Sequence, residues 1–362
     1  MDVTHQSGPS ATHPQSWKVG KRHTLIVSPV FDTYWRFAAE RQALFMRRLH
    51  GRPCPWTTDE ILGTYRFTNV YRAADRVSQY LIKNVIYSGD QTSEEVFFRT
   101  LLFKLFNRIE TWELLQYELG QITCATFQVE RYSKILDLAM SNKATIYSPA
   151  YIIPPPQFGA ARKHRNHLLL LEHILRNQTL ARIEAARSLE EVFQIFASQP
   201  SFGPFLAFQF AIDLNYSEVL NFSEMDFVVA GPGAQSGIRK CILDSAGLDE
   251  SSVIRAFAEA ADSEFERRGL EFQSLWGRPL QLIDCQNLFC EVDKYSRVRH
   301  PDVSTNSGRT RIKQRFRASA APLPQWYPPK WGLRPTAIDK ELADPRTATN
   351  AQLGLDLSNY RH

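Results

Sequence analysis

Four polar residues recur at helical spacing within residues 282–295. Their separations of three, four and three positions place them on one face of a helix: Asp284, Asn287, Glu291 and Lys294. Two carboxylates, an amide and an ammonium can together supply a general base, a metal ligand and a phosphate clamp. The alternative is a solvated helix face that carries an ordinary Glu–Lys ion pair.

Residues 67–77 contain a second polar set. On a helix, Asn69, Arg72 and Arg76 would share a face, with Asp75 beside them. Arginine forks hold phosphate in two-point geometry, so this face is typical of a contact with a substrate phosphate or a DNA backbone. Ion pairs with acids on a neighbouring helix are the structural alternative.

Basic and imidazole side chains gather at residues 162–167, where a Gly-Ala turn leads into a helix. His164 and His167 are potential metal ligands, but no matched partners accompany them. A solvated or phosphate-facing role for Lys163 and His164 is therefore preferred.

A glycine-rich turn, Gly231-Pro232-Gly233, separates two helices that we expect to begin at Ser223 and near Gln235. This pattern predicts a helix-hairpin-helix, whose free backbone N–H groups and helix dipole bind a nucleic-acid phosphate without reading the base. Simple punctuation between helices is the alternative. The DNA-binding residues predicted here are Gly231, Gly233, Ala234, Gly237, Arg239 and Lys240.

The net charge of +5 is unevenly distributed. Residues 294–317 hold eight Lys and Arg against Asp302 alone, so this segment carries +7 and the rest of the chain −2. Local basicity is typical of a polyanion contact, and a solvated basic linker is the alternative. The residues expected to contact DNA in this basic ribbon are Arg309, Arg311, Lys313 and Arg315.

The elements that must position these residues are mostly helices. Apolar residues recur at helical spacing, and few stretches alternate with period two. In the stripe over residues 31–48, Arg41 interrupts the apolar face one turn after Phe37. Start signals at Asp59, Ser93 and Ser188 mark further helices. We expect helices over residues 31–48, 93–107, 111–119, 123–140, 163–177 and 188–196.

Composition narrows the class of protein. The 362 residues have an ordinary globular composition, with five scattered cysteines that favour reduced thiols. No stretch reaches the ~18 apolar residues of a membrane helix, and the first twenty residues do not resemble a secretory signal. We therefore expect an intracellular protein, nuclear or cytoplasmic, without a membrane partner.

The sequence predicts an all-α domain at residues 25–300, between a polar tail at 1–24 and a basic, Pro/Trp-rich segment at 301–335 that packs on the body. A further tail covers 336–362. Trp326, Tyr327 and Trp331 would anchor the Pro/Trp-rich part, and a partner-binding peptide is the alternative. No P-loop, G-x-G-x-x-G, H-E-x-x-H or G-x-S-x-G motif is found.

Five blocks in the same order give a resemblance to a known family. The sequence resembles the α-glutamyl/putrescinyl-thymine pyrophosphorylase family, also described as the helical domain of 5-hydroxymethyl-deoxyuridine DNA kinase. The blocks are FTNVYRAADRVSQYL, FFRTLLFKLFNRIETWE, FLAFQFAIDLNYS, DFVVAGPGAQSGIRKC and LIDCQNLFCEVDKYSR.

The resemblance implies an all-helical fold similar to helix-hairpin-helix DNA glycosylases. It also implies a role in hypermodification of thymine or 5-hydroxymethyluracil in DNA, in which an amine or amino-acid donor displaces (pyro)phosphate from an activated base. The implied catalytic residues are Asp284, Gln286, Asn287, Glu291, Lys294 and Asp213. The implied substrate- and phosphate-binding residues are Asn69, Arg72, Asp75, Arg99, Asn107, Lys163 and His164.

On this hypothesis the target base is flipped out of double-stranded DNA and stacks on Tyr71 or Phe289. Asp284 or Glu291 would serve as the base, while Arg72 and Lys294 neutralise the leaving phosphate. The cofactor is unknown; no metal-ligand motif is present, and Mg²⁺ at the two carboxylates is left open. The oligomeric state is also left open.

Two departures from the family separate the competing functions. The chain lacks the P-loop of the kinase fusions, so phosphorylation of the base is not expected of it. It also lacks an aspartate at the usual glycosylase distance of about twenty residues beyond the hairpin, the nearest being Asp249. The alternatives are a non-catalytic DNA-binding module and a glycosylase-like enzyme that removes a modified base.

Overall fold

The computed structural model describes residues 15–149, 153–303, 308–319 and 325–333. Within them the chain is mostly helical, with one small antiparallel sheet, so the expected all-α class is right for the body and misses the sheet. The α-helices are α1 (Pro29–Leu49), α2 (Glu60–Thr64), α3 (Arg76–Tyr80), α4 (Ser93–Phe106), α5 (Ile109–Leu119), α6 (Val129–Ser141), α7 (Lys163–Arg176), α8 (Thr179–Glu184), α9 (Leu189–Ala197), α10 (Pro204–Leu214), α11 (Pro232–Cys241), α12 (Glu250–Glu259), α13 (Ala261–Arg267) and α14 (Leu282–Arg299).

Shorter elements complete the described chain. They are the 3₁₀ turns η1 (Arg72–Ala74) and η3 (Pro329–Trp331), the π-helical turn η2 (Leu81–Ile86), and the strands β1 (Gln15–Val19), β2 (His23–Val27) and β3 (Ile242–Asp244). Among the described residues, no helix is both long and apolar enough to cross a membrane. The tail predicted for 336–362 lies outside the described residues.

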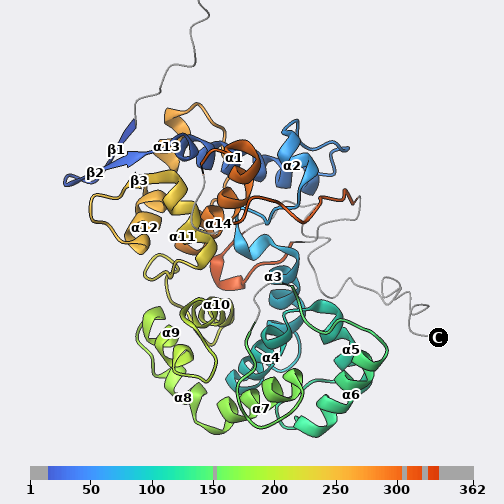
Figure 1. Ribbon diagram of the computed structural model, residues 1–362. Helices are drawn as coiled ribbons and strands as arrows, with labels where there is room; N and C mark the ends of the chain where they lie inside the picture. Colours follow the sequence, from blue (N-terminus) through green and yellow to red (C-terminus); the bar gives the residue numbers. More distant parts are fainter. Residues whose placement is uncertain (1–14, 150–152, 304–307, 320–324, 334–362) are drawn as a thin grey trace, which may run out of the picture.

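The elements form two lobes (Figure 1). One lobe joins the first two helices to the sheet and to α11–α14, so that the two ends of the helical body pack together. The other lobe contains α4–α9, and α3 and α10 lie where the lobes meet. The chain therefore leaves the first lobe after α2 and returns to it at α11.

Several helix starts follow the predicted signals. Ser188 accepts a hydrogen bond from the backbone N–H of Glu191 at 3.1 Å, as its capping-box spacing indicates. Asp59 caps α2 through the N–H of Leu62 at 2.8 Å. A cap that was not predicted lies at α14, where Gln281 and Asp284 form a reciprocal capping box. Side-chain caps satisfy N–H groups that the first turn of a helix leaves without partners.

In the first half of the chain, two predicted helical stretches are wrong. Residues 67–75 are mainly irregular, with only the single turn η1, and α3 begins at Arg76, so Asn69, Arg72 and Arg76 do not share a helix face. The helix expected from residue 123 begins at Val129. In the first case the backbone is held by side chains from distant elements, described below, which local sequence patterns do not reveal.

The sheet occupies part of the segment expected to be a polar tail. Strands β1, β2 and β3 pair antiparallel in that order, with Trp17 opposite Leu25 and Val27 opposite Ile242. Trp17 is buried because its ring packs against Phe31 and Phe257 at centroid distances of 5.0 and 4.9 Å. Strands of five residues, with one buried side chain in β1 and two in β2, give too short an alternation to detect.

The predicted hairpin glycines serve helix packing. A Cβ added at Gly237 would lie 2.1 Å from the Phe289 carbonyl oxygen, and one at Gly233 would lie 2.9 Å from the Cys290 Sγ. These glycines let α11 and α14 approach closely. The short helix expected from Ser223 is absent; residues 221–231 form turns and irregular chain, and α11 begins at Pro232.

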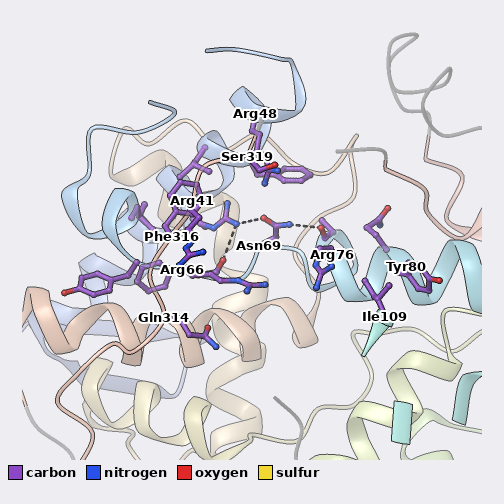
Figure 2. A pocket seen from close by; sticks show the side chains of 18 of the residues that line it. Arg41, Arg48, Arg66, Asn69, Arg76, Tyr80, Ile109, Gln314, Phe316 and Ser319 are labelled. Atoms are coloured by element: carbon purple, nitrogen blue, oxygen red, sulfur yellow. Dashed lines mark hydrogen bonds between the residues drawn. The ribbon is translucent and has the colours of Figure 1, made fainter. Parts of the chain in front are cut away.

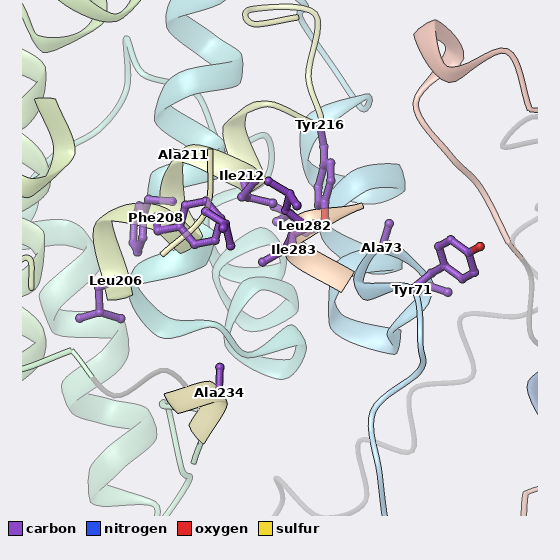
Figure 3. Packing of buried hydrophobic residues seen from close by; sticks show 14 of the residues in the cluster. Tyr71, Ala73, Leu206, Phe208, Ala211, Ile212, Tyr216, Ala234, Leu282 and Ile283 are labelled. Carbon is purple, nitrogen blue, oxygen red and sulfur yellow. The ribbon is translucent and has the colours of Figure 1, made fainter. Parts of the chain in front are cut away.

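Apolar residues of α10 and α14 form the core where the lobes meet (Figure 3). Phe208 and Ile212 of α10 and Ile283 of α14 are at most 1% exposed. The C-terminal segment covers an adjacent edge, because the Trp326 ring packs on Tyr87 at 4.7 Å. The predicted anchoring of the aromatic tail residues on the body is thus observed for this part of the chain.

Candidate functional site

A cavity of about 1050 Å³ opens beside the junction of the two lobes. One wall comes from α1, α2 and the chain that follows α2, and the opposite wall from α3, η2 and α5. Residues 313–319, which contain the C-terminal end of the basic ribbon (residues 294–317), form a third side. Figure 2 shows Arg41 next to Asn69, with Arg76, Tyr80 and Ile109 on the opposite side. We call this cavity the basic cleft.

Positive side chains dominate the lining of the basic cleft. Among the described lining residues, Glu113 is the one carboxylate. The basic lining residues are Arg41, Arg48, Arg66, Arg76, Lys83, Lys313, Arg315 and Arg317. A concave surface lined by charges of one sign concentrates its field and attracts ligands of the opposite sign.

Backbone hydrogen bonds fix the basic ribbon to the body. Tyr65 and Arg315 form an antiparallel bridge, the N–H of Arg66 donates to the Gln314 carbonyl at 3.0 Å, and the N–H of Phe316 donates to Thr64 at 2.9 Å. Lys313 and Arg315, two of the predicted DNA-binding residues, therefore line the basic cleft.

The two preceding predicted residues of the ribbon lie outside this lining. Arg309 and Arg311 are exposed and do not line the cleft. The Arg311 carbonyl nevertheless accepts a hydrogen bond from Arg297 Nη1 at 3.2 Å, which ties this part of the ribbon to α14. Residues 314–316 are hydrogen-bonded to the body, so this part of the ribbon is not a freely solvated linker.

Asn69 lies at the floor of the basic cleft. Its Oδ1 accepts from Arg41 Nη2 at 2.5 Å, its Nδ2 donates to the Ala74 carbonyl at 2.6 Å, and its N–H donates to Asp75 Oδ1 at 2.7 Å. Burial raises the pKa of Asp75 to about 6, against the lowering effects of the Asn69 N–H and the nearby Arg41. Asn69 is thus fixed in orientation by three partners.

Glu291 and Lys294 of α14 contact residues 67–68, next to Asn69. Glu291 Oε2 accepts the N–H of Thr68 at 3.0 Å and pairs with Lys294 Nζ at 3.1 Å, and that ammonium lies 4.5 Å from the centroid of the Phe67 ring. Neither residue lines the cleft, and Asn287 is half-buried one turn earlier. The predicted polar face is therefore not a fully solvated surface: part of it contacts residues 67–68, and its catalytic role stays a prediction.

Asp284 and Gln286 are enclosed. Asp284 is 4% exposed, and its carboxylate oxygens accept the N–H groups of Arg72 at 2.8 Å and of Gln281 at 3.0 Å. Gln286 is fully buried. In this conformation Asp284 caps the start of α14 and Gln286 packs in the core, and their direct contact with a substrate stays a prediction.

Mg²⁺ at Asp284 and Glu291 is not supported by this geometry. Seven helical residues span about 10 Å along the axis, and both oxygens of Asp284 are already engaged. The described residues contain no cluster of three or more His, Cys, Asp or Glu that could hold a metal ion.

Arg72 is the centre of a buried ionic network. Its Nη1 lies 2.6 Å from Asp213 Oδ1 and 3.1 Å from the Tyr216 hydroxyl, while Lys104 Nζ pairs with Asp213 Oδ2 at 2.8 Å. Asn107 ends α4 and accepts from Lys104 at 3.0 Å. In this structure the two charges face each other in the core, and the phosphate and catalytic roles expected of Arg72 and Asp213 stay predictions.

Three other predicted residues lie away from the basic cleft and have structural partners. Arg99 is buried and donates to the carbonyl of Val85 at 3.0 Å. His164 is 1% exposed, and burial lowers its pKa despite the Asp137 carboxylate at 3.3 Å. Lys163 lies 4.5 Å from the centroid of the Tyr147 ring. None of the three lines the basic cleft, and the phosphate contact expected of them stays a prediction.

Most of the α11 residues predicted to contact DNA are buried in this structure. Lys240 is 3% exposed and pairs with Asp293 at 3.0 Å, and Ala234 and Gly237 are buried. Arg239 alone of the predicted basic pair is exposed. Tyr71 and Phe289, expected to stack on an extruded base, are also buried.

The sequence reasoning missed most of the cleft. Arg41, Arg48 and Arg66 were not predicted as site residues, nor was Glu113. One signal for this site was present in the sequence. Arg41 interrupts the apolar stripe of α1, and a cation on an otherwise apolar helix face indicates a specific partner or ligand. Arg48 follows it by two helical turns.

The fold and the site together define a mainly helical protein with an arginine-lined cleft beside its lobe junction. The family of the 5-hmdU DNA kinase helical domain matches residues 28–305, and the chain belongs to this family.

A "5-hmdU DNA kinase" of Bacillus phage SP10 is similar to this chain, with 29% identity over 290 residues. The match covers 74% of this chain and 45% of the phage protein, so the chain corresponds to less than half of that relative. No solved structure matches this protein significantly.

Proposed function

We propose that this chain binds DNA that carries 5-hydroxymethyluracil and takes part in the modification of that base. The charge of the basic cleft carries this proposal: eight Lys and Arg side chains line it with the single carboxylate of Glu113 among the described residues. Family membership and the name of the phage relative supply the base.

The basic side chains of the cleft suit DNA phosphates. Among the described residues, Arg48, Arg66 and Arg315 form no ion pair with a carboxylate. Arginine binds phosphate oxygens in two-point geometry, and each phosphate neutralised releases counterions from the DNA. The basic ribbon and α1 would then contact the DNA backbone from two sides of the cleft.

A base in a duplex must leave the stack before an enzyme can modify its 5-substituent. Tyr71 and Phe289 are buried, and the half-buried aromatic rings in the cleft lining are those of Tyr65, Tyr80 and Phe316. We propose that these take the stacking role and that Asn69, held in place by Arg41, reads the edge of the base.

The amine-displacement reaction also remains a proposal. In it, a carbon–nitrogen bond forms at the 5-methylene carbon, the carbon–oxygen bond to phosphate breaks, phosphate leaves with the electron pair, and the amine loses a proton. Glu113 lines the cleft and has a pKa raised by burial, so we propose it, in place of the enclosed Asp284, as the proton acceptor.

The binding test compares duplexes of one sequence that contain thymine or 5-hydroxymethyluracil, by fluorescence anisotropy. We expect binding to both and tighter binding to the modified duplex. Failure to bind either duplex at low salt would contradict the proposal.

A chemical test incubates the chain with DNA whose hydroxymethyl group is phosphorylated, together with an amine, and analyses the nucleosides by mass spectrometry. An aminated nucleoside that is lost in Glu113→Gln, with binding retained, supports the reaction. Binding without product points to the DNA-binding module, and a lyase-sensitive abasic site to the glycosylase-like alternative.

A further inference from the structure

Two arginines of α1 present unsatisfied hydrogen-bond donors at the basic cleft. Arg41 and Arg48 are seven residues apart on one helix face, and both line the cleft. Arg41 donates through Nε to the Thr68 carbonyl at 2.9 Å and through Nη2 to Asn69. Its Nη1 and the Nε of Arg48 are buried and have no acceptor among the described residues.

This arrangement is unfavourable without a ligand. Buried polar groups in folded proteins almost always have a partner, and a buried donor on a charged group is especially costly to leave without one. The charge of Arg48 also acts against that of Arg41, since both are positive. Burial lowers the pKa of Arg41 to about 10, so the guanidinium is still charged at neutral pH.

Neighbouring carboxylates do not complete the pair. Asp75 and Glu291 favour the charged form of Arg41, but their hydrogen bonds go to the backbone of Asn69 and Thr68. Arg48 has the Trp56 ring beside it, 5.5 Å from its guanidinium carbon, and no carboxylate partner in the described chain. A ligand with several acceptor oxygens and negative charge fits this gap.

We propose that Arg41 and Arg48 form a phosphate subsite in the basic cleft. This proposal rests on the proposed function, because the phosphate would belong to bound DNA. Two sources share the same chemistry: a backbone phosphodiester, or a phosphate monoester on the 5-hydroxymethyl group of the base. In the second case, a kinase reaction must supply the substrate of this chain.

Arg48→Gln is the informative variant, because the Arg48 side chain makes no hydrogen bond within the described part of the chain, whereas Arg41 donates to the Thr68 carbonyl. Arg36→Gln is the matched control: Arg36 is on the same helix, is exposed and does not line the cleft. Binding is measured for duplexes that contain thymine, 5-hydroxymethyluracil or its phosphate monoester. Protection by pyrophosphate against thermal unfolding is measured without DNA.

We expect pyrophosphate to raise the Tm of the wild-type chain and of Arg36→Gln, but much less that of Arg48→Gln. If the base carries the phosphate, the monoester duplex binds the wild type about tenfold more tightly than the hydroxymethyl duplex, and Arg48→Gln removes this preference. If the backbone carries it, Arg48→Gln weakens all three duplexes alike.

An Arg48→Gln chain that matches the wild type in all these assays would overturn the subsite. The failure of the proposed function looks different: no duplex binds at all, while pyrophosphate protection still depends on Arg48. The two proposals can therefore fail separately.

Discussion

At the scale of single residues, several charged side chains that were predicted to be catalytic instead contact the backbone and side chains behind the cleft wall. Asp284 accepts two backbone N–H groups, one of them from Arg72, whose guanidinium in turn contacts Asp213. Removing one partner from a buried ionic network leaves an uncompensated charge and strongly destabilises a fold. These residues position the segment that carries Asn69. Arg41, Arg48 and Arg66 line the cleft next to that segment.

Asp284 predicts a pH dependence of stability. Burial and the nearby Glu224 carboxylate raise its pKa to about 7, above the value of an unfolded aspartate. The protonated form therefore stabilises the fold fully at acidic pH, and this contribution is lost as pH rises through 7. We expect Asp284 to reduce the free energy of unfolding by about 2 kcal/mol between pH 5.5 and pH 8.

Urea denaturation of the wild type and of Asp284→Asn at these two pH values measures the effect. The variant cannot ionise at this position, so its decrease over the same interval should be smaller by that amount. The exposed Asp302→Asn serves as the control and should follow the wild type. Equal pH dependence in all three chains would show that Asp284 is ionised throughout.

At the scale of elements, the contact between α11 and α14 determines where the polar residues of α14 lie. The glycines of α11 bring its backbone against α14, and this contact occupies one side of that helix. Another part of α14 then contacts residues 67–69 through Glu291 and Lys294. The glycines of the predicted DNA-binding motif therefore allow α11 and α14 to pack closely, and DNA binding by this motif stays a prediction.

Gly237→Ala tests this packing. Its Cβ would meet the Phe289 carbonyl oxygen at 2.1 Å, and backbone atoms of two packed helices cannot move apart cheaply. We expect a loss of about 3 kcal/mol in the free energy of unfolding, measured by urea denaturation. Gly63→Ala in α2 is the control, because nothing lies within 4 Å of its added Cβ; a comparable loss there would contradict the packing argument.

At the scale of the whole molecule, the basic cleft exists because distant parts of the chain meet. Its walls combine α1, the segment after α2, α3 with η2, and the ribbon near residue 315. The C-terminal segment adds a further link between elements: Lys330 Nζ donates to the carbonyls of Asn215 at 2.7 Å, Ser217 at 2.5 Å and Leu220. The cleft is therefore a property of the assembled lobes.

The cleft predicts a defined salt dependence of DNA binding. Neutralising its three ribbon residues, Lys313, Arg315 and Arg317, to Gln should reduce the slope of log K against log salt concentration by about three units, since each phosphate contact contributes close to one. Fluorescence anisotropy titrations at several salt concentrations measure the slope.

The control for this titration removes the same charge from exposed positions on α6 and α8, namely Arg131, Lys134 and Arg182. We expect its slope to stay close to that of the wild type. An equal reduction in the control would mean that net charge, and not the cleft, determines binding.

The sequence by itself determined the local elements and the family. Apolar periodicity and caps such as Ser188 and Asp59 are short-range features, so they located most helices, including the one that carries Asp284 and Lys294. The order of five sequence blocks indicated the family that residues 28–305 match. The basic ribbon was also visible, because charge is a property of composition.

Only the tertiary structure decided which polar residues face the cleft. Burial depends on elements far apart in the chain: Lys240 meets Asp293, and Arg72 meets Asp213, across more than fifty and one hundred positions. The same long-range packing exposes Arg41 and Arg48 to a shared cavity, which no local pattern encodes. Helical spacing specifies a face, but the partner that packs against that face decides whether its charges stabilise the fold or bind a ligand.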